Sequence, residues 1–263
     1  MIKFCSLLSG SSGNAIFFRK DNTKILIDAG LSGKKIAQAL ASIGESPTEL
    51  NAILISHEHI DHIKGAGILS RRYNIPIYAN AGTWQSMKDM IGSVASENIG
   101  VFDTGCEFEI GDVCVKSFPI PHDAAEPVGF NLFAENKKVT IATDIGHVNK
   151  TLVSCLELSD LILLESNHDT EMLKVGSYPW PLKQRIAGGL GHLSNDMAGK
   201  VACYLAQKGT RRFLLGHLSQ ENNFPELAYQ TVYNALCESK AVVGGDVILG
   251  VAERNCVGEV VEL

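Results

Sequence analysis

Four side chains of metal-binding type lie within six consecutive residues of the segment ILISHEHIDHIKG. They are His57, His59, Asp61 and His62, and they follow an apolar run that is typical of a buried strand. Imidazole and carboxylate groups are the ligands that divalent transition metals prefer. Side chains two positions apart in an extended segment point to the same side, so His57 and His59 could hold one ion. Asp61 and His62, at the turn into a helix, could face a second ion.

The alternative for this segment is a polar loop whose histidines only cap the following helix. Four ligand-type residues in six positions, directly after an apolar strand, favour the metal site. Metals alone do not select a substrate, because the same chemistry suits phosphodiesters, thioesters, lactones and β-lactams.

The elements that would position these residues alternate between strands and helices in the first third of the chain. Apolar runs predict strands at 2–8, 14–18, 23–30 and 51–56, and helical spacing predicts helices over 33–44 and 63–73. Further strands are expected at 106–110, 112–120, 128–135, 138–146, 158–166, 211–219 and 245–250, with helices over 197–209 and 225–239. This order predicts an α/β fold, a four-layer αβ/βα sandwich in which helices flank two mixed β-sheets.

The composition is that of an ordinary globular protein. The chain has 263 residues and a net charge of −6, which argues against indiscriminate nucleic-acid binding but leaves room for a local basic patch. No apolar run reaches membrane-spanning length, and the N-terminal segment is a poor signal peptide. Seven scattered cysteines without a C-x-x-C pair are typical of free thiols in a reducing compartment. We therefore expect a single cytoplasmic domain over residues 1–263, with no membrane partner.

The H-x-H-x-D-H motif after a strand resembles the signature of the metallo-β-lactamase fold. This is a hydrolase superfamily whose fold is the αβ/βα sandwich predicted above. Its members usually hold two metals with this motif, a later histidine, a bridging aspartate and a final histidine, each after a strand. The resemblance implies that His122, Asp144 and His217 complete the ligand set. It also implies that Asp28 supports the metal loop from behind.

Other histidines compete with His217 for the last ligand position. His147, His168 and His192 also lie in the C-terminal half, but the apolar strand that enters the Gly216-His217 pair favours His217. The implied cofactors are two divalent metal ions. A histidine-rich set with carboxylates fits zinc first, with manganese or iron as alternatives.

Two later segments resemble the nuclease branch of the superfamily, which includes tRNA 3′-processing endonucleases. Glu165 ends the apolar strand of LILLESNHD, and His192 stands in a glycine-rich turn before a helix. The likeness implies that Asp61 orients a hydroxide bridging the two metals. It further implies that Glu165 and His192 form the general acid that protonates the leaving oxygen. The alternative is that His192 only helps to form the helix N-terminus and that Glu165 is an ordinary strand-end carboxylate.

Eight segments together resemble one small bacterial group, the single-domain WalJ-type exonucleases associated with cell-wall metabolism. They are SGSSGNA, DAGLSGKKI, SHEHIDHIKG, ATDIGHV, LLESNHD, YPWPLKQRI, GHLSN and GHLSQENN, spread over nearly the whole chain. The resemblance implies a metal-dependent phosphodiesterase that degrades DNA in preference to RNA, from a 5′ end. The alternatives are a small-molecule hydrolase of the same fold, such as a glyoxalase II-like thioesterase or a lactonase, and a non-catalytic metal-binding regulatory protein. The oligomeric state stays open.

Cations and aromatic rings near residue 180 could contact such a substrate. Lys183 and Arg185 follow Tyr178 and Trp180, a mixture that suits phosphate contact and base stacking. A solvated amphipathic helix would explain the same residues.

The N-terminal segment SLLSGSSGNAIFF offers a second place for phosphate. Its glycines let an anion approach the backbone amides closely, and Ser11, Ser12 and Asn14 add short donors. We expect this loop to face phosphate at the rim of the active site, with a merely permissive turn as the alternative.

Overall fold

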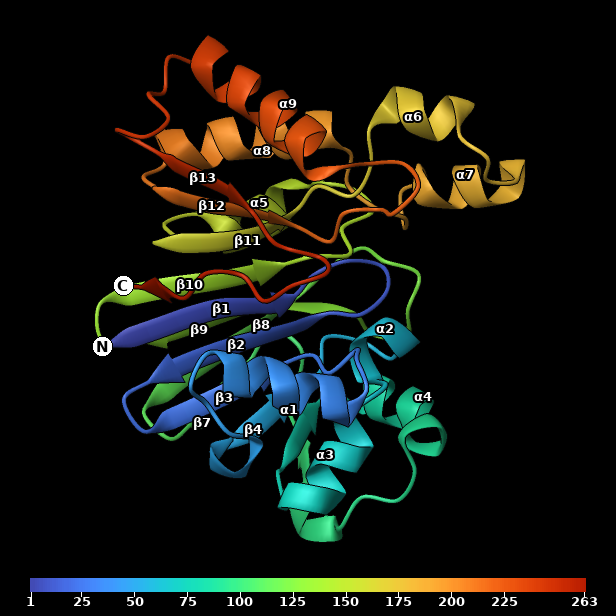
Figure 1. Cartoon of the computed structure of the whole chain (residues 1–263), viewed down its shortest axis with the longest axis vertical. Coiled ribbons are helices and arrows are strands. Elements are labelled where there is room, and N and C mark those ends of the chain that lie inside the picture. Colours follow the sequence, from blue (N-terminus) through green and yellow to red (C-terminus); the bar gives the residue numbers. More distant parts are fainter.

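Two seven-stranded β-sheets pack face to face in the computed structural model, which describes residues 1–263 (Figure 1). In spatial order, the first sheet consists of β14 (Val261–Glu262), β1 (Ile2–Leu8), β2 (Ala15–Lys20), β3 (Thr23–Ile27), β4 (Ala52–Leu54), β5 (Ile77–Ala79) and β6 (Ile99–Val101). The second consists of β13 (Ile248–Val251), β12 (Arg212–Gly216), β11 (Leu161–Glu165), β10 (Lys137–Ala142), β9 (Val128–Ala134), β8 (Val113–Pro119) and β7 (Glu107–Ile110). Both sheets are mixed, because β3 to β6 and β10 to β13 run parallel while the other pairs run antiparallel.

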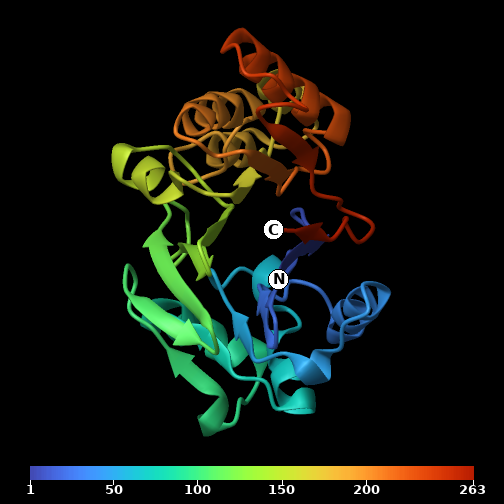
Figure 2. The ribbon, with the colours of Figure 1, turned by 90° about the vertical axis from the view of Figure 1, so that its left-hand side faces the viewer.

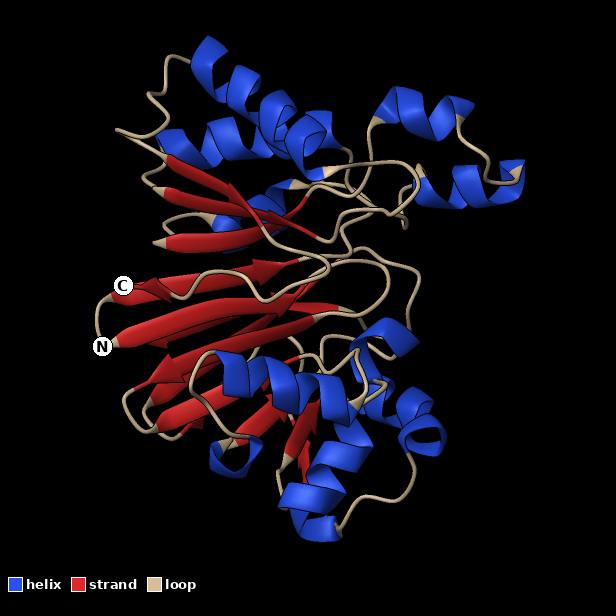
Figure 3. Ribbon diagram, in the orientation of Figure 1, coloured by secondary structure: helices blue, strands red, loops and turns tan.

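Helices cover the outer face of each sheet and complete four layers (Figures 2 and 3). The helices beside the first sheet are α1 (Gly33–Ser42), α2 (Ile60–Ile63), α3 (Ala66–Tyr73) and α4 (Ala81–Ile91), with the 3-10 turns η1 (Pro47–Glu49) and η2 (Ser96–Asn98). Beside the second lie α5 (Lys150–Leu156), α8 (Asn195–Gln207) and α9 (Pro225–Glu238), while α6 (Thr170–Val175) and α7 (Trp180–Ile186) project to one side. The predicted αβ/βα sandwich is confirmed. None of these helices has both the length and the apolar character that crossing a membrane requires.

Three apolar clusters hold the layers together. One fills the space between the inner faces of the sheets and contains Phe18 and Phe130; the other two join each sheet to its own helices. Strands β3 and β11 are buried along their whole length, since both of their faces are covered. This explains why residues 25–27 of β3 and 161–164 of β11 are continuous apolar runs rather than alternating ones.

The helix predicted over 63–73 is wrong in its first part. The segment forms α2 and α3 with a break at Gly65, whose amide donates to the Ala29 carbonyl over 2.7 Å. A Cβ at Gly65 would lie 2.3 Å from the Leu31 carbonyl oxygen, so this close approach of two backbones requires glycine. The short edge strands β6 and β14 were not predicted, because two or three residues carry no readable period.

The site residues lie at the carboxyl ends of parallel strands from both sheets. Asp28 follows β3, Asp144 follows β10 and His217 follows β12, and their φ angles are 58°, 62° and 57°. Residues with side chains seldom adopt this left-handed conformation, and those that do cluster at functional sites. Both sheets thus place polar residues with a strained backbone at the same edge of the sandwich.

Candidate metal centre and active site

The structure brings together all seven side chains predicted as metal ligands. Their donor atoms form three overlapping groups, each within 4.8 Å: His57, His59 and His122; His57, His62 and Asp144; and Asp61, His62 and His217. A fourth group joins Asp144, Glu165, His192 and His217. Because the groups share members, they form one continuous centre. Its side chains are numerous enough to serve as ligands for two metal ions.

Four histidines direct Nδ1 away from the centre and leave Nε2 facing it. The Nδ1 partners are Ser56 Oγ for His57 (3.0 Å), Asp28 Oδ2 for His62 (2.8 Å), the Gly191 carbonyl for His122 (3.0 Å) and Glu165 Oε1 for His217 (2.8 Å). An outer partner of this kind fixes the orientation of the ring and leaves the other nitrogen as the ligand atom. Asp28 thus lies behind His62, on the side away from the centre.

Three polar atoms inside the centre are buried without a hydrogen-bond partner. They are His57 Nε2, Asp144 Oδ2 and His217 Nε2. Buried polar atoms are normally paired, so each of these atoms calls for a ligand. Imidazole nitrogens and aspartate oxygens are donors that divalent zinc, manganese and iron all accept. The residues present therefore fit divalent metal ions.

Asp144 is the central acid of the site. Its Oδ2 lies 3.4 Å from His62 Nε2, and its Oδ1 lies 3.4 Å from His217 Nδ1 and 3.7 Å from His122 Nε2. Burial alone would raise the pKa of this carboxyl, but His217 and His62 hold that pKa below its ordinary value. Asp61 is the more open acid, with a side chain 22% exposed and Oδ2 at 3.7 Å from both His62 Nε2 and His217 Nε2.

Glu165 accepts hydrogen bonds from three separate segments of the site, those of Ile145, of His192 and Leu193, and of His217. Its Oε1 accepts hydrogen bonds from His192 Nδ1 (2.9 Å) and His217 Nδ1 (2.8 Å), and its Oε2 accepts from the amides of Ile145 (2.6 Å) and Leu193 (3.0 Å). Burial alone would raise the pKa of this carboxyl, but the two histidines hold that pKa well below its ordinary value. Because an ionised carboxylate only accepts, both histidines must carry a proton on Nδ1.

His192 lies at the open side of the centre. Its side chain is 17% exposed, and its ring centroid lies 5.1 Å from that of His122 and 5.2 Å from that of His217. Glu165 occupies Nδ1, so Nε2 is the atom that could exchange a proton with a bound molecule. Glu165 itself is fully buried, so its carboxylate contacts its four donors and not solvent.

The comparison with known proteins agrees with this geometry. Residues 23–218 match the family described as the beta-lactamase superfamily domain, a span that contains every candidate ligand. The chain belongs to this family. Exodeoxyribonuclease WalJ of Streptococcus pneumoniae is 43% identical over 246 residues, which cover 93% of this chain and 91% of that protein. Exodeoxyribonuclease YycJ of Bacillus anthracis is 38% identical over 243 residues, 92% of each chain.

A solved structure confirms the fold of this beta-lactamase superfamily domain. The metallo-β-lactamase fold protein YhfI of Bacillus subtilis superposes with a TM-score of 0.74, covering 98% of this chain and 100% of that chain at 15% identity. Both resemblances stated from the sequence, to the metallo-β-lactamase fold and to the WalJ-type group, are therefore confirmed.

The β1–β2 loop reaches the metal centre, but Asn14 does not lie on the rim as predicted. Asn14 is 2% exposed, its Nδ2 lies 3.1 Å from His62 Nε2, and its amide donates to the Asp61 carbonyl over 2.8 Å. Its side chain is enclosed because it links the loop to the ligand segment. Ser11 and Ser12 form the exposed tip of the loop.

The two predicted cations of α7 have different surroundings. Arg185 pairs with Asp123 through Nε (2.5 Å) and Nη2 (3.0 Å), and Asp123 Oδ1 lies 3.4 Å from His122 Nε2. Arg185 therefore lies beside the metal centre. Lys183 instead donates to the Lys174 carbonyl over 2.7 Å, so its ammonium group ties α7 to α6.

Two of the three rival histidines, His147 and His168, lie outside the groups of candidate ligands, whereas His192 belongs to the fourth group. His147 is exposed, with Nδ1 2.7 Å from the Gly189 carbonyl. His168 is buried beside α8, and burial lowers its pKa to about 4. The structure therefore places His217, and neither of these two, against Asp61 and Asp144.

Ser56 is a residue of the site that the sequence reasoning missed. Its amide donates to Asp28 Oδ1 over 2.9 Å, and its hydroxyl lies 2.9 Å from Asp28 Oδ2 and 3.0 Å from His57 Nδ1. Ser56 thus links the acid behind His62 to the first ligand. The available signal was its place directly before the H-x-H-x-D-H motif.

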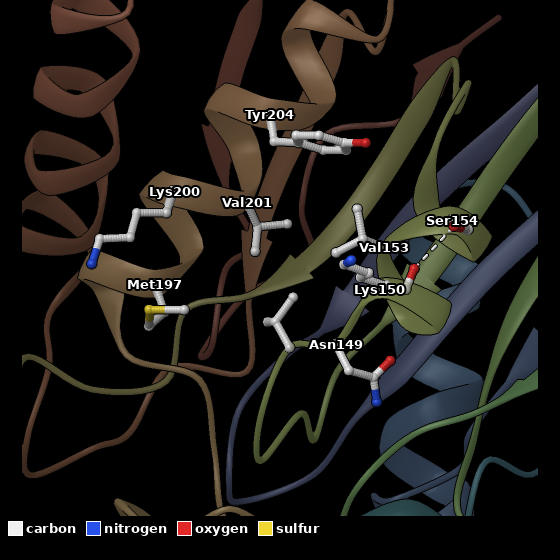
Figure 4. A pocket seen from close by; sticks show the side chains of 9 residues that line it. Asn149, Lys150, Val153, Ser154, Met197, Lys200, Val201 and Tyr204 are labelled. Atoms are coloured by element: carbon white, nitrogen blue, oxygen red, sulfur yellow. Dashed lines mark hydrogen bonds between the residues drawn. The ribbon is translucent and has the colours of Figure 1, made fainter.

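A groove of about 820 Å³ lies apart from these residues, between α5 and α8 (Figure 4). Valine side chains, Met197 and Tyr204 form its apolar lining, with Lys150 and Lys200 among them. No candidate ligand or acid lines this groove, so the chemistry of the protein is not located there.

Proposed function

We propose that this chain is a metal-dependent exodeoxyribonuclease that hydrolyses phosphodiester bonds from the 5′ end of DNA. The pair of Glu165 and His192 beside the ligand cluster carries the proposal, because a leaving alkoxide needs a proton whereas a thiolate does not. Two relatives named as exodeoxyribonucleases align over more than nine-tenths of this chain, which supports DNA as the substrate. Trp180, 67% exposed on α7, and the nearby Arg185 support a strand that stacks bases and carries phosphates.

In this proposal, His57, His59 and His122 would hold one divalent ion, Asp61, His62 and His217 would hold another, and Asp144 would complete the donor set. Such ions supply an activated water at neutral pH and neutralise charge on the attacked phosphate. Asp61, the more open acid, orients the attacking water. As the new phosphorus–oxygen bond forms and the bond to O3′ breaks, His192 gives its Nε2 proton to O3′. Glu165 keeps the ring in place throughout.

Three finer points belong to the same proposal. Zinc is the expected metal, with manganese or iron as alternatives, since the donor set accepts all three. The protein acts in the cytoplasm, as its scattered cysteines suggest. It works as one domain over residues 1–263, which the pairing of β14 with β1 supports.

A substrate panel tests the proposal. The chain is reconstituted separately with Zn²⁺, Mn²⁺ and Fe²⁺ and assayed on single- and double-stranded DNA, RNA of the same sequence, a thioester and a lactone. We expect nucleotides to be released from the 5′ end of DNA faster than from RNA. Turnover of only the thioester or lactone would establish a small-molecule hydrolase, and metal binding without turnover of any substrate would establish a regulatory role.

The acid role of His192 makes a separate prediction. His192→Ala should slow DNA hydrolysis by about 10²-fold or more, because O3′ no longer receives a proton. The same variant should lose much less activity on bis-p-nitrophenyl phosphate, whose leaving group needs no proton. His147→Ala, an exposed histidine outside the ligand groups, is the control. An equal loss on both substrates would instead assign His192 to binding or structure.

A further inference from the structure

Arg254 is a half-buried arginine in the segment that follows β13. Figure 1 shows this red segment running beside the blue β1–β2 loop at the edge where the metal centre lies. Arg254 Nη2 donates to Ser11 Oγ over 3.0 Å and to the Leu218 carbonyl over 2.9 Å. Both acceptors are neutral, and no carboxylate pairs with this guanidinium.

Arg254 differs from Arg19 and Arg185, which both pair with a carboxylate. Arg19 pairs with the buried Glu45 over 2.9 Å, and Arg185 pairs with Asp123. Arg254 Nε, by contrast, is buried without any partner. Burial lowers the pKa of this guanidinium, which means that its surroundings disfavour the charge they enclose. A bound anion would relieve that cost.

Hydrogen bonds connect the segment of Arg254 to the residues around the candidate ligand His217. Leu218, whose carbonyl it contacts, directly follows the candidate ligand His217. Ser9 accepts from the His217 amide over 2.8 Å through its hydroxyl, and its own amide donates to the Glu253 carbonyl over 3.0 Å. The arginine is therefore fixed beside His217, which is also the ligand next to His192.

The tip of the β1–β2 loop adds further donors at the same place. Ser11 and Ser12 are exposed, and their amides make no hydrogen bond within the chain. Gly10 lets the arginine lie flat on the loop, because a Cβ there would come 3.0 Å from Arg254 Nε. Backbone amides, hydroxyls and a guanidinium together form the donor set that phosphate oxygens accept.

We propose that Arg254, Ser11 and Ser12 bind the 5′-terminal phosphate of the DNA strand. The inference rests on the proposed function. It adds that the terminal phosphate is the feature of the substrate by which the protein recognises the 5′ end. Hydrolysis of the first phosphodiester bond releases a nucleotide that carries O3′ at one side and the terminal phosphate at the other. His192 protonates O3′, so the terminal phosphate must lie beyond it on the leaving-group side. Arg254 contacts the carbonyl of Leu218, which directly follows His217, and the His217 ring lies 5.2 Å from that of His192, so we assign the terminal phosphate to Arg254.

Matched substrates and variants test the inference. The metal-reconstituted chain is assayed on two oligonucleotides that differ only in a 5′-phosphate or a 5′-hydroxyl. We expect kcat/KM to be at least about ten-fold higher for the phosphorylated strand, in line with charge-assisted hydrogen bonds to one phosphate. In Arg254→Gln this ratio should fall to near one, and Arg254→Lys should restore part of it. Arg212→Gln, at the opposite end of β12, should keep the ratio of the unaltered chain.

Two results would overturn the inference while leaving the proposed function intact. The first is that the unaltered chain degrades both strands equally well. The second is that Arg254→Gln loses activity on both strands while the ratio of their kcat/KM values stays unchanged. That second result would indicate a structural role for the hydrogen bond from Arg254 to the Leu218 carbonyl. Absence of any DNA hydrolysis would overturn the proposed function instead. In that case, fluorescence anisotropy of the two labelled strands with the full chain still decides whether Arg254 recognises the phosphate.

Discussion

Asp144→Asn is expected to leave the fold intact, to reduce the number of bound metal ions and to abolish the nuclease activity. Asp144 is the only acid whose two oxygens face histidines from both sheets, with His62 on one side and His122 and His217 on the other. Asparagine keeps the shape, but its amide group offers one weak acceptor in place of two charged oxygens. Loss of an outer-sphere partner already costs about 10–100-fold in metal affinity or activity, so loss of this direct ligand should cost on the order of 10³-fold or more.

Metal content measured by plasma mass spectrometry checks this result alongside the DNA assay. We expect two ions per chain in the unaltered protein and one or none in Asp144→Asn. Asp112→Asn is the matched control, because Asp112 is exposed in the β7–β8 turn and its carboxylate makes no hydrogen bond. If Asp144→Asn retained two ions and full activity, Asp144 would not be a bridging ligand.

A local pattern in the sequence indicated four of the seven candidate ligands, and the resemblance to the metallo-β-lactamase fold implied the other three. The H-x-H-x-D-H segment contains its donors within six residues, and His122, Asp144 and His217 each follow an apolar run that could be recognised as a strand. Parallel strands present their carboxyl ends at one edge, so residues placed there meet in space although the chain separates them widely. Strand order therefore predicts the fold class, while the complete set of candidate ligands also depended on the resemblance to the metallo-β-lactamase fold.

Contacts without a periodic signature could not be predicted in the same way. Arg254 reaches Ser11 across 243 positions of sequence, in a segment with no regular element. The glycine and serine residues of the β1–β2 loop predict an exposed donor at Asn14, whereas its side chain points inward to His62. In both cases the outcome depends on where two loops pack, and composition alone does not encode that.

Glu165→Gln is expected to damage the site more widely than His192→Ala, although Glu165 touches no substrate. All four hydrogen bonds to this side chain come from donors, two on each oxygen: the imidazoles of His192 and His217, and the amides of Ile145 and Leu193. The NH₂ group of glutamine must face one of these pairs, so two donors lose their acceptor whichever way the amide is turned. Each such loss in a fully buried place costs about 1–3 kcal/mol, and with two losses the free energy of unfolding should fall by about 2–6 kcal/mol.

Metal affinity separates positioning by Glu165 from acid catalysis by His192. Glu165→Gln releases His217, a candidate ligand, as well as His192, so its affinity for metal should fall by about 10–100-fold. Its DNA hydrolysis should fall by about 10³-fold, since the acid and a ligand are displaced together. His192→Ala should keep its metal affinity in a competition titration with a chromophoric chelator. Glu107→Gln, on the exposed edge strand β7, is the control for loss of a surface carboxylate. If Glu165→Gln bound metal as tightly as the unaltered chain, Glu165 would act on His192 alone.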